Sequence, residues 1–117
     1  YTEEQISTIP DSLKKRFLVQ DSVSQNDFQR RINKDIQKLI QFRQFNLMAT
    51  AYPIATMFQL IFCRNLLYYL HPKKREYLLR KLVDNLEIGG WLVLGITETG
   101  YKLDGMKKLA FSIYQKD

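Results

Sequence analysis

The chain has 117 residues, of which 45% are hydrophobic and 26% are charged, and its formal net charge is +6. This composition excludes an intrinsically disordered segment, and the length predicts one small core. One cysteine and one histidine exclude a disulfide framework and a Cys/His zinc site, and the lack of a signal peptide or of an apolar run of roughly 18 residues predicts a cytoplasmic protein without membrane insertion.

The positive charge is concentrated in residues 14–43, which contain eight lysines and arginines against three aspartates. A basic segment attracts nucleic acid, acidic lipid or an acidic protein surface, and it is also typical of an ordinary solvated face. Few aromatic residues and no recognised nucleic-acid motif accompany the charge, so nucleic-acid binding is the weaker interpretation. We expect no nucleic-acid partner.

The first elements precede residue 58. A Pro-Asp-Ser cluster predicts a short helix that runs into a strand over residues 13–19. Residues 21–28 are polar and turn-like. The next segment shows helical spacing and then alternation, which predicts a mixed segment that ends in a strand near Ile40 to Phe45. Residues 46–57 are typical of a loop with a short helical turn.

The next stretch, "FQLIFCRNLLYYLHP", predicts a buried strand at Gln59 to Cys63 that ends in polar residues. An amphipathic helix follows from His71 and Pro72 to Leu86, and two glycines at 89 and 90 are expected to close it. Cys63 is expected to be a buried strand-end cysteine and not a nucleophile.

The last elements are a buried strand in "WLVLGIT", a loop over residues 98–109, and a final strand in "AFSIYQKD" with Phe111, Ile113 and Gln115 on one face. A crossover helix between two buried strands predicts a parallel α/β sheet, whereas the final pair of strands is free to be antiparallel. Ligands of such sheets bind beyond the carboxyl ends of the strands. Arg64 and Asn65 follow the first buried strand at this position.

Together, "FQLIFCRNLLYYL", the helix, "LEIGGWLVLGITET" and "SIYQK" resemble the C-terminal half of the catalytic domain of CheR-type chemotaxis-receptor methyltransferases. "IPDSLKKRFL" and "IQFRQFNLM" are similar to the stretches that flank the small β-subdomain of this family. The resemblance implies part of a Rossmann-like S-adenosylmethionine methyltransferase fold over residues 1–117, with an antiparallel final strand. About residues 14–45 would be the β-subdomain-like segment and 46–117 the C-terminal half of the sheet.

The resemblance also implies site residues. The cofactor contacts of the family correspond to Asn46, Leu47, Cys63, Arg64 and Tyr69, of which Arg64 and Tyr69 are also the candidate catalytic residues. S-adenosylmethionine would be the cofactor and S-adenosylhomocysteine the product, and no metal is implied. Taken without the family, each of these residues has a structural alternative: a turn residue, a core residue or a strand-end arginine that reaches solvent.

The sequence departs from the family in several places. It has Gln59, Ile88 and Thr97 where the family usually has aspartate, proline and serine. All five glycines, at 89, 90, 95, 100 and 105, follow the predicted helix, so the Gly-rich cofactor loop and the acidic ribose ligand are expected in a preceding half of the protein, together with a basic helical domain.

The implied function is methylation of glutamate side chains on the cytoplasmic helices of chemotaxis receptors, as part of a longer chain. The alternative is a catalytically incomplete methyltransferase-like module that binds a protein partner. In either case the basic residues 14–43 could support weak electrostatic docking on an acidic helical surface.

Overall fold

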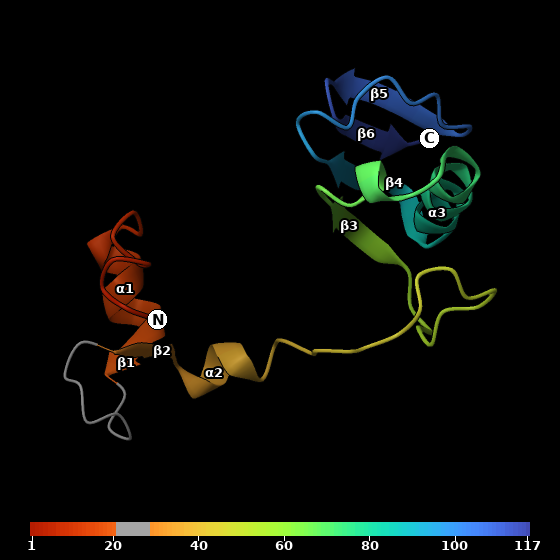
Figure 1. Cartoon of the computed structure of the whole chain (residues 1–117). Helices are drawn as coiled ribbons and strands as arrows, with labels where there is room; N and C mark the ends of the chain where they lie inside the picture. Colours follow the sequence, from red (N-terminus) through yellow and green to blue (C-terminus); the bar gives the residue numbers. More distant parts are fainter. Residues whose placement is uncertain (21–28) are drawn as a thin grey trace. The chain divides into compact units, whose positions relative to one another are not determined.

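The structure is a computed structural model that describes residues 1–20 and 29–117. The turn-like segment predicted at 21–28 lies outside the described residues. The chain divides into two compact units, unit 1 (Tyr1–Gln44) and unit 2 (Phe45–Asp117). Among the described helices, none has the length and apolar character to cross a membrane. Figure 1 labels the elements, which are α1 (Asp11–Phe17), β1 (Leu18–Gln20), β2 (Arg30–Ile32), α2 (Lys34–Gln37), β3 (Phe58–Cys63), η1 (Leu67–Tyr69), α3 (Pro72–Asp84), β4 (Leu86–Leu94), β5 (Met106–Ala110) and β6 (Ile113–Lys116).

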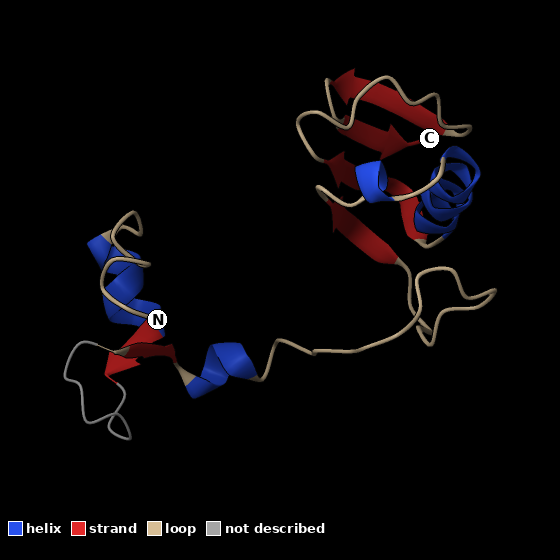
Figure 2. Ribbon diagram, in the orientation of Figure 1, coloured by secondary structure: helices blue, strands red, loops and turns tan. Residues whose placement is uncertain are grey.

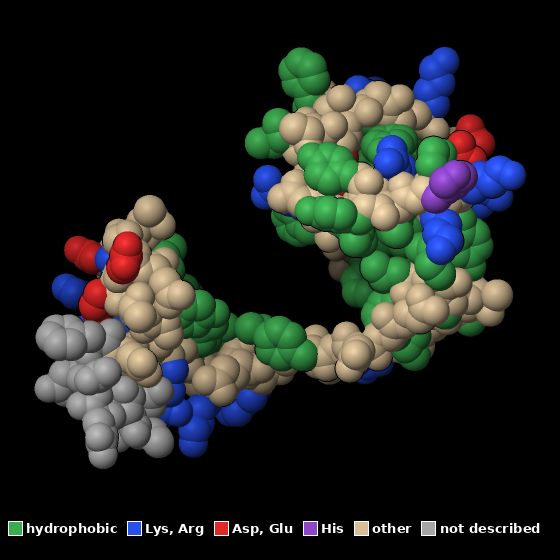
Figure 3. All heavy atoms as spheres, in the orientation of Figure 1, with side chains coloured by type: hydrophobic (Ala, Val, Ile, Leu, Met, Phe, Trp, Pro, Cys, Tyr) green, Lys and Arg blue, Asp and Glu red, His purple; other side chains and the backbone are tan. Residues whose placement is uncertain are grey.

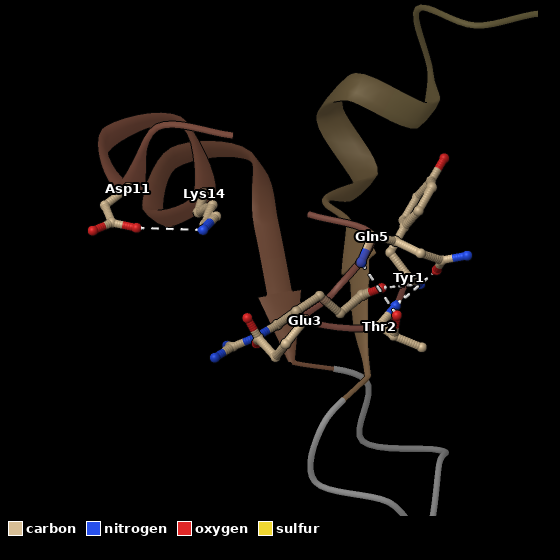
Figure 4. A network of polar contacts seen from close by, with 7 residues as sticks. Tyr1, Thr2, Glu3, Gln5, Asp11 and Lys14 are labelled. Carbon is tan, nitrogen blue, oxygen red and sulfur yellow. Dashed lines mark hydrogen bonds and ion pairs between the residues drawn. The ribbon is translucent and has the colours of Figure 1, made fainter. Parts of the chain in front are cut away.

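Unit 1 contains α1, β1, β2 and α2, and its N-terminal segment makes several polar contacts. The predicted helix that runs into a strand is confirmed by α1 and β1, and β1 pairs with β2 in antiparallel register. Figure 4 shows two hydrogen bonds between Thr2 and Gln5. The Thr2 N–H donates to the side-chain oxygen of Gln5 at 2.9 Å, and the Gln5 N–H donates to the hydroxyl of Thr2 at 3.3 Å. Arg30 also pairs with Glu3 at 2.8 Å. The Arg30–Glu3 pair connects the N-terminal segment to β2, and the Thr2–Gln5 bonds close a turn within that segment.

The strand predicted near Ile40 to Phe45 is wrong, because these residues form no regular structure. Asn33 caps the short helix α2 by accepting a hydrogen bond from the Ile36 N–H at 3.0 Å, and α2 ends at Gln37. Phe42 is 94% exposed. Alternation predicts a strand only where one face is buried and a neighbouring strand pairs with it. Residues 40–44 are all exposed in the structure and pair with no described strand. The loop predicted over residues 46–57 is confirmed, and the structure places a turn in it at residues 47 and 48.

Unit 2 contains a four-stranded mixed sheet in the order β3-β4-β6-β5. The strands β3 and β4 are parallel and are joined by α3, whereas β6 is antiparallel to β4 and to β5. Figure 2 shows α3 beside the sheet. The predicted strand–helix–strand crossover and the antiparallel end are therefore confirmed. The burial predicted for the strand at Gln59 to Cys63 is wrong for one face, because the described residues leave Leu60 and Phe62 of β3 at 47% and 65% exposure. The buried core comprises Cys63, Leu67, Leu78, Leu79, Leu82, Val83, Leu86, Leu92, Leu94 and Tyr114.

The helix α3 begins as predicted, with His71 at the N-cap and Pro72 in the first turn. Its end differs from the prediction, because the helix stops at Asp84 and the two glycines lie inside β4. Gly89 has φ 77°, and a Cβ on Gly90 would lie 2.8 Å from the Glu87 carbonyl oxygen and 3.1 Å from that of Phe58. The glycines therefore form a bulge against β3, where the register shifts, and do not cap the helix.

The C-terminal prediction needs two corrections. Met106 to Leu109, predicted as a loop, belong to the edge strand β5, and Phe111 lies in the turn between β5 and β6 with 81% exposure. In β6 the buried side chain is Tyr114, so the inward face is opposite to the predicted one. The polar, lysine-containing β5 is an ordinary edge strand, which hydrophobic alternation does not detect.

Candidate functional site

The carboxyl ends of β3 and β4 meet at one edge of the sheet of unit 2. These strands are parallel, and their last residues, Cys63 and Leu94, are register partners. Two loops therefore leave the same edge: loop A, residues 64–67, after β3, and loop B, residues 95–98, after β4. Ligands of open α/β sheets bind beyond such edges.

Loop A turns sharply at Asn65, which has φ 57°. Among the described residues, it is the one residue other than glycine with positive φ. Asparagine tolerates this left-handed conformation better than most residues. The turn leaves Arg64 exposed at the strand end, next to the buried Cys63.

A buried carboxylate joins the two loops. Glu98 is 2% exposed, and its oxygens accept hydrogen bonds from the backbone N–H groups of Asn65 at 2.8 Å, Leu67 at 2.7 Å and Gly95 at 2.8 Å. Burial by itself raises the pKa of Glu98, but the hydrogen bonds from backbone N–H groups outweigh it and hold the pKa below its usual value. Glu98 is therefore a charged clamp between loops A and B.

Gly95 leaves the space that this carboxylate occupies. A Cβ at Gly95 would lie 2.6 Å from Oε2 of Glu98 and 2.7 Å from Oδ1 of Asn65. The Glu98 N–H in turn donates to the Gly95 carbonyl oxygen at 2.9 Å, which closes loop B into a tight turn. Glycine is needed here for space, because the φ of Gly95 is not positive.

A second contact joins Tyr68, directly after loop A, to Thr97 of loop B. The hydroxyl groups of Tyr68 and Thr97 lie 2.7 Å apart, in an exposed position. Arg75 of α3 donates to the carbonyl oxygens of Leu70 at 2.7 Å and Tyr68 at 3.3 Å. The backbone from η1 into α3 is therefore also held in one conformation.

An apolar groove of about 480 Å³ lies in unit 2 beside this edge. Its lining is almost entirely hydrophobic, and Arg64 is the charged residue in it. The lining residues are Phe45, Leu47, Tyr52, Ile54, Phe58, Leu60, Ile61, Phe62, Cys63, Arg64, Leu66, Leu78, Leu82 and Asn85. A groove of this size and character suits a flat apolar ring, with one cation available for an anionic group.

The structure brings together three of the five predicted site residues, because Leu47, Cys63 and Arg64 line this groove. Asn46 precedes Leu47 but is exposed, and its side-chain oxygen accepts the Met48 N–H at 2.9 Å in a local turn. Asn46 is therefore engaged in the turn that presents Leu47.

The fifth residue, Tyr69, does not line the groove. Its side chain is 82% exposed and packs edge-to-face against Tyr68, with ring centroids 5.8 Å apart. Tyr69 ends η1, which begins at the last residue of loop A, so its backbone lies near the same edge of the sheet.

Cys63 is confirmed as a buried strand-end cysteine. Burial, with a smaller contribution from the Glu98 carboxylate, raises the pKa of the Cys63 thiol to about 11. The thiol is therefore protonated at neutral pH and is not a nucleophile. In the part of the chain that the structure describes, no cluster of three acidic, histidine or cysteine side chains could hold a metal ion.

Sequence reasoning missed Glu98 and Gly95. The signal was the spacing in "LVLGITE", where a glutamate follows three residues after a glycine at the end of an apolar strand. That spacing lets a carboxylate accept the N–H group three residues earlier and close a turn. The contacts with loop A, more than 30 residues away, leave no local trace in the sequence.

Residues 1–114 of the chain match the family described as CheR methyltransferase, SAM binding domain. The chain is 32% identical over 111 residues to a chemotaxis protein methyltransferase of Borreliella burgdorferi, which covers 95% of this chain and 37% of the relative. It is also 32% identical over 98 residues to chemotaxis protein methyltransferase 2 of Pseudomonas aeruginosa, with coverages of 84% and 35%. A chemotaxis protein methyltransferase of Vibrio anguillarum is 36% identical over 73 residues, with coverages of 62% and 26%. The chain thus spans about a third of the length of such relatives.

Proposed function

Because the chain belongs to the CheR methyltransferase SAM-binding domain family, we propose that it forms the C-terminal part of the catalytic domain of a protein-glutamate methyltransferase that acts on chemotaxis receptors. The cofactor of this family is S-adenosylmethionine, and its fold is the Rossmann-like methyltransferase fold that the sequence predicted. The glutamate acceptor, the receptor substrate and the activity of the whole protein are parts of the proposal.

The observation that carries the proposal is the position of Arg64. It stands at the carboxyl edge of two parallel strands, in the lining of an apolar groove. Among the described residues its guanidinium has no hydrogen-bond or ion-pair partner. An unpaired guanidinium at a ligand-binding edge is available to a ligand carboxylate, which it can bind through two parallel hydrogen bonds.

The residues present fit part of S-adenosylmethionine. Leu47 and its apolar neighbours in the groove would hold the flat adenine ring and exclude water, and Arg64 would bind the carboxylate of the methionine part. The turn at Asn46 would fix the backbone beside the ring. When bound, the cofactor supplies a methyl group on a sulfonium centre. Tyr69 would enter the site only through a change of side-chain rotamer, since it is exposed in this structure.

The proposed reaction requires positioning and no general base. A glutamate side chain has a pKa of about 4.3, so it is already ionised at neutral pH. The role of this part of the protein is then to hold and orient its ligand. The protonated Cys63 is consistent with this role, because a reactive thiolate beside an alkylating cofactor would be a hazard.

A binding experiment tests the cofactor site. Calorimetric titration of the full-length protein with S-adenosylhomocysteine should show binding, and Arg64→Ala should weaken it by about 2 to 4 kcal/mol, as expected for the loss of a charge-assisted partner. Arg80→Ala is the matched control, because Arg80 is an exposed arginine on α3 outside the groove. Tyr69→Phe should cost less than Arg64→Ala because the ring remains. Equal affinity in Arg64→Ala and Arg80→Ala would remove Arg64 from the site.

A second experiment tests the acceptor. The full-length protein should transfer labelled methyl groups from the cofactor to a receptor cytoplasmic fragment, and the label should be released as methanol in base, since carboxylate methyl esters are base-labile. Replacement of the fragment's glutamates by alanine should abolish the labelling. If the wild-type protein does not bind S-adenosylhomocysteine at all, the alternative of a partner-binding module takes the place of the enzyme.

The basic segment of unit 1 supports weak docking on an acidic surface. Figure 3 shows Lys and Arg side chains, in blue, gathered over the β2 and α2 part of unit 1. Arg30 is already paired with Glu3, whereas Lys15 and Lys34 are exposed and belong to α1 and α2. Exposed lysines attract an acidic partner mainly by raising its association rate. Lys15 and Lys34 are therefore better test positions than Arg30.

A further inference from the structure

We propose that Glu98 is a positioning residue of the cofactor site: its carboxylate holds loop A against loop B and thereby fixes the backbone that presents Arg64. The inference rests on the proposed function of Arg64 as the ligand of the cofactor carboxylate. It concerns a residue that does not line the groove and acts through the backbone of others.

The first argument is the placement of the donors. Two of the three N–H groups on Glu98, those of Asn65 and Leu67, belong to loop A, and the third, that of Gly95, belongs to loop B. Glu98 itself lies in loop B, so its side chain connects segments more than 30 residues apart in sequence. The Tyr68–Thr97 contact joins the neighbouring positions but is exposed to water. The buried connection between the loops among the described residues is therefore the Glu98 carboxylate.

The second argument is the position of Arg64 between two fixed neighbours. Cys63 is buried in the core at the end of β3, and Asn65 is held in a left-handed conformation by its N–H bond to Glu98. The backbone of Arg64 is thereby fixed on both sides although its side chain is exposed. A long arginine side chain binds a carboxylate in a forked geometry only when its base is held in place.

The third argument is the chemical suitability of a carboxylate. Three N–H donors converge on Glu98, and an ionised carboxylate is an acceptor on both oxygens. A glutamine of the same shape has one acceptor oxygen and an NH2 group that would face the remaining N–H groups. Gly95 supplies the space that the carboxylate needs. The sequence thus provides the acceptor, the donors and the space in one place.

The first test is made on the chain itself by amide hydrogen exchange, with Glu98→Gln as the variant. In wild type the N–H groups of Asn65 and Gly95 share Oε2 of Glu98, and the Leu67 N–H donates to Oε1. The one acceptor oxygen of the glutamine should stay with Asn65 and Gly95, so the Leu67 N–H should lose at least tenfold of its protection from exchange. The protection of core N–H groups in β4 should change little. Glu87→Gln is the matched control, because Glu87 is a glutamate of β4 whose carboxylate contacts the side chain of Gln59. Unchanged protection of Leu67 in Glu98→Gln would overturn the clamp.

The second test uses the affinity of the full-length protein for S-adenosylhomocysteine. Glu98→Gln should weaken binding at least tenfold, and Glu87→Gln should leave it within twofold. In an Arg64→Ala background, the further loss caused by Glu98→Gln should fall below about twofold, because both changes remove the same interaction. A role in overall stability alone would instead leave the two effects independent.

The outcomes separate this inference from the proposed function. Absence of binding by the wild-type protein, or normal binding by Arg64→Ala, contradicts the proposed function. Binding that depends on Arg64 but not on Glu98, or losses that are additive in the double variant, contradicts the positioning role alone. If Glu98→Gln does not fold, Glu98→Asp, which keeps the charge on a shorter side chain, takes its place in the comparison with Arg64→Ala. Additive losses of affinity in the Glu98→Asp and Arg64→Ala double variant would equally contradict the positioning role.

Discussion

Gly95→Ala is the change for which the structure predicts the clearest effect. The new methyl group would lie 2.6 Å from Oε2 of Glu98, 2.7 Å from Oδ1 of Asn65 and 3.0 Å from the Asn65 backbone nitrogen. One of these neighbours is backbone, and the buried carboxylate oxygen is held by hydrogen bonds. The Glu98 carboxylate must therefore move, and at least one of its N–H bonds must lengthen or break.

The cost combines two contributions. Overpacking a tight site typically costs about 1–3 kcal/mol, and losing a hydrogen bond to a charged group costs about 1.5–3 kcal/mol. The two contributions do not add in full, because the movement of the carboxylate that relieves the overpacking is the same movement that breaks a hydrogen bond. We therefore expect a decrease in the free energy of unfolding of about 2–4 kcal/mol. Urea unfolding of the chain, followed by the fluorescence of Trp91, measures this quantity for unit 2, because Trp91 lies in β4 and is the only tryptophan in the sequence.

Gly100→Ala is the matched control. Gly100 follows loop B closely in sequence, has φ 84°, and a Cβ there would meet nothing within 4 Å. Its replacement should cost only the conformational strain of a left-handed alanine, about 1–2 kcal/mol. If Gly95→Ala destabilises unit 2 no more than Gly100→Ala does, the close packing of Glu98 against Gly95 is not what holds loop B.

Three further predictions concern the site, and one concerns unit 1. The lowered pKa of Glu98 contributes stability that is present above its unfolded value of about 4.3 and is lost as the pH falls through the lower folded value, so urea midpoints measured from pH 7 to pH 3 should fall more steeply in the wild type than in Glu98→Gln. Cys63, with its pKa of about 11, should react with iodoacetamide at pH 8 roughly a hundredfold more slowly in the folded chain than in urea; equal rates would show an accessible thiol. Asn65→Gly should change stability by less than about 0.5 kcal/mol, whereas Asn65→Val should cost about 2 kcal/mol in the same urea assay, because a β-branched residue is strained at φ 57°. Lys15→Glu combined with Lys34→Glu should slow association with a receptor fragment, measured by stopped flow at low and physiological salt, and leave cofactor affinity unchanged; an association rate indifferent to both the mutations and the salt would make the segment an ordinary solvated face.

Much of unit 2 could be predicted from the sequence because its strongest signals are local. The strand at Gln59 to Cys63 and the amphipathic helix after Pro72 were confirmed as elements, since an apolar run and an apolar stripe leave clear patterns. The burial predicted for the strand was wrong on one face, where Leu60 and Phe62 are exposed. The parallel pairing of β3 and β4 followed from the crossover helix between them.

The errors share a physical cause, which is that the sequence pattern does not say which surface a residue meets. Ile40 to Phe45 alternate as a strand does but form no strand, and Phe42 is 94% exposed. Gly89 and Gly90 stand where a helix cap is expected, yet a nearer stop at Asn85 ends the helix and leaves them for a bulge in β4. Phe111 is apolar but lies in a hairpin turn.

The candidate site was predicted only in part for a related reason. Leu47, Cys63 and Arg64 were named through the resemblance to the family, and they do line the groove. The end of β3 at Cys63 also places Arg64 at the ligand edge of the sheet. Glu98 was not found because its donors come from another loop, and a side chain that binds distant backbone N–H groups has no sequence signature. The roles of Asn46 and Tyr69 as cofactor contacts stay predictions.

The strand β3 lies at one end of the described sheet and has one neighbour there, β4. Leu60 and Phe62 on its surface are about half exposed or more, at 47% and 65%. A strand with an unpaired side and exposed apolar residues is a template for another strand, which makes it a site of aggregation when the chain is prepared alone. Concentrated solutions of the isolated chain should therefore self-associate through β3, and salt should favour this by screening the repulsion of a chain with net charge +6.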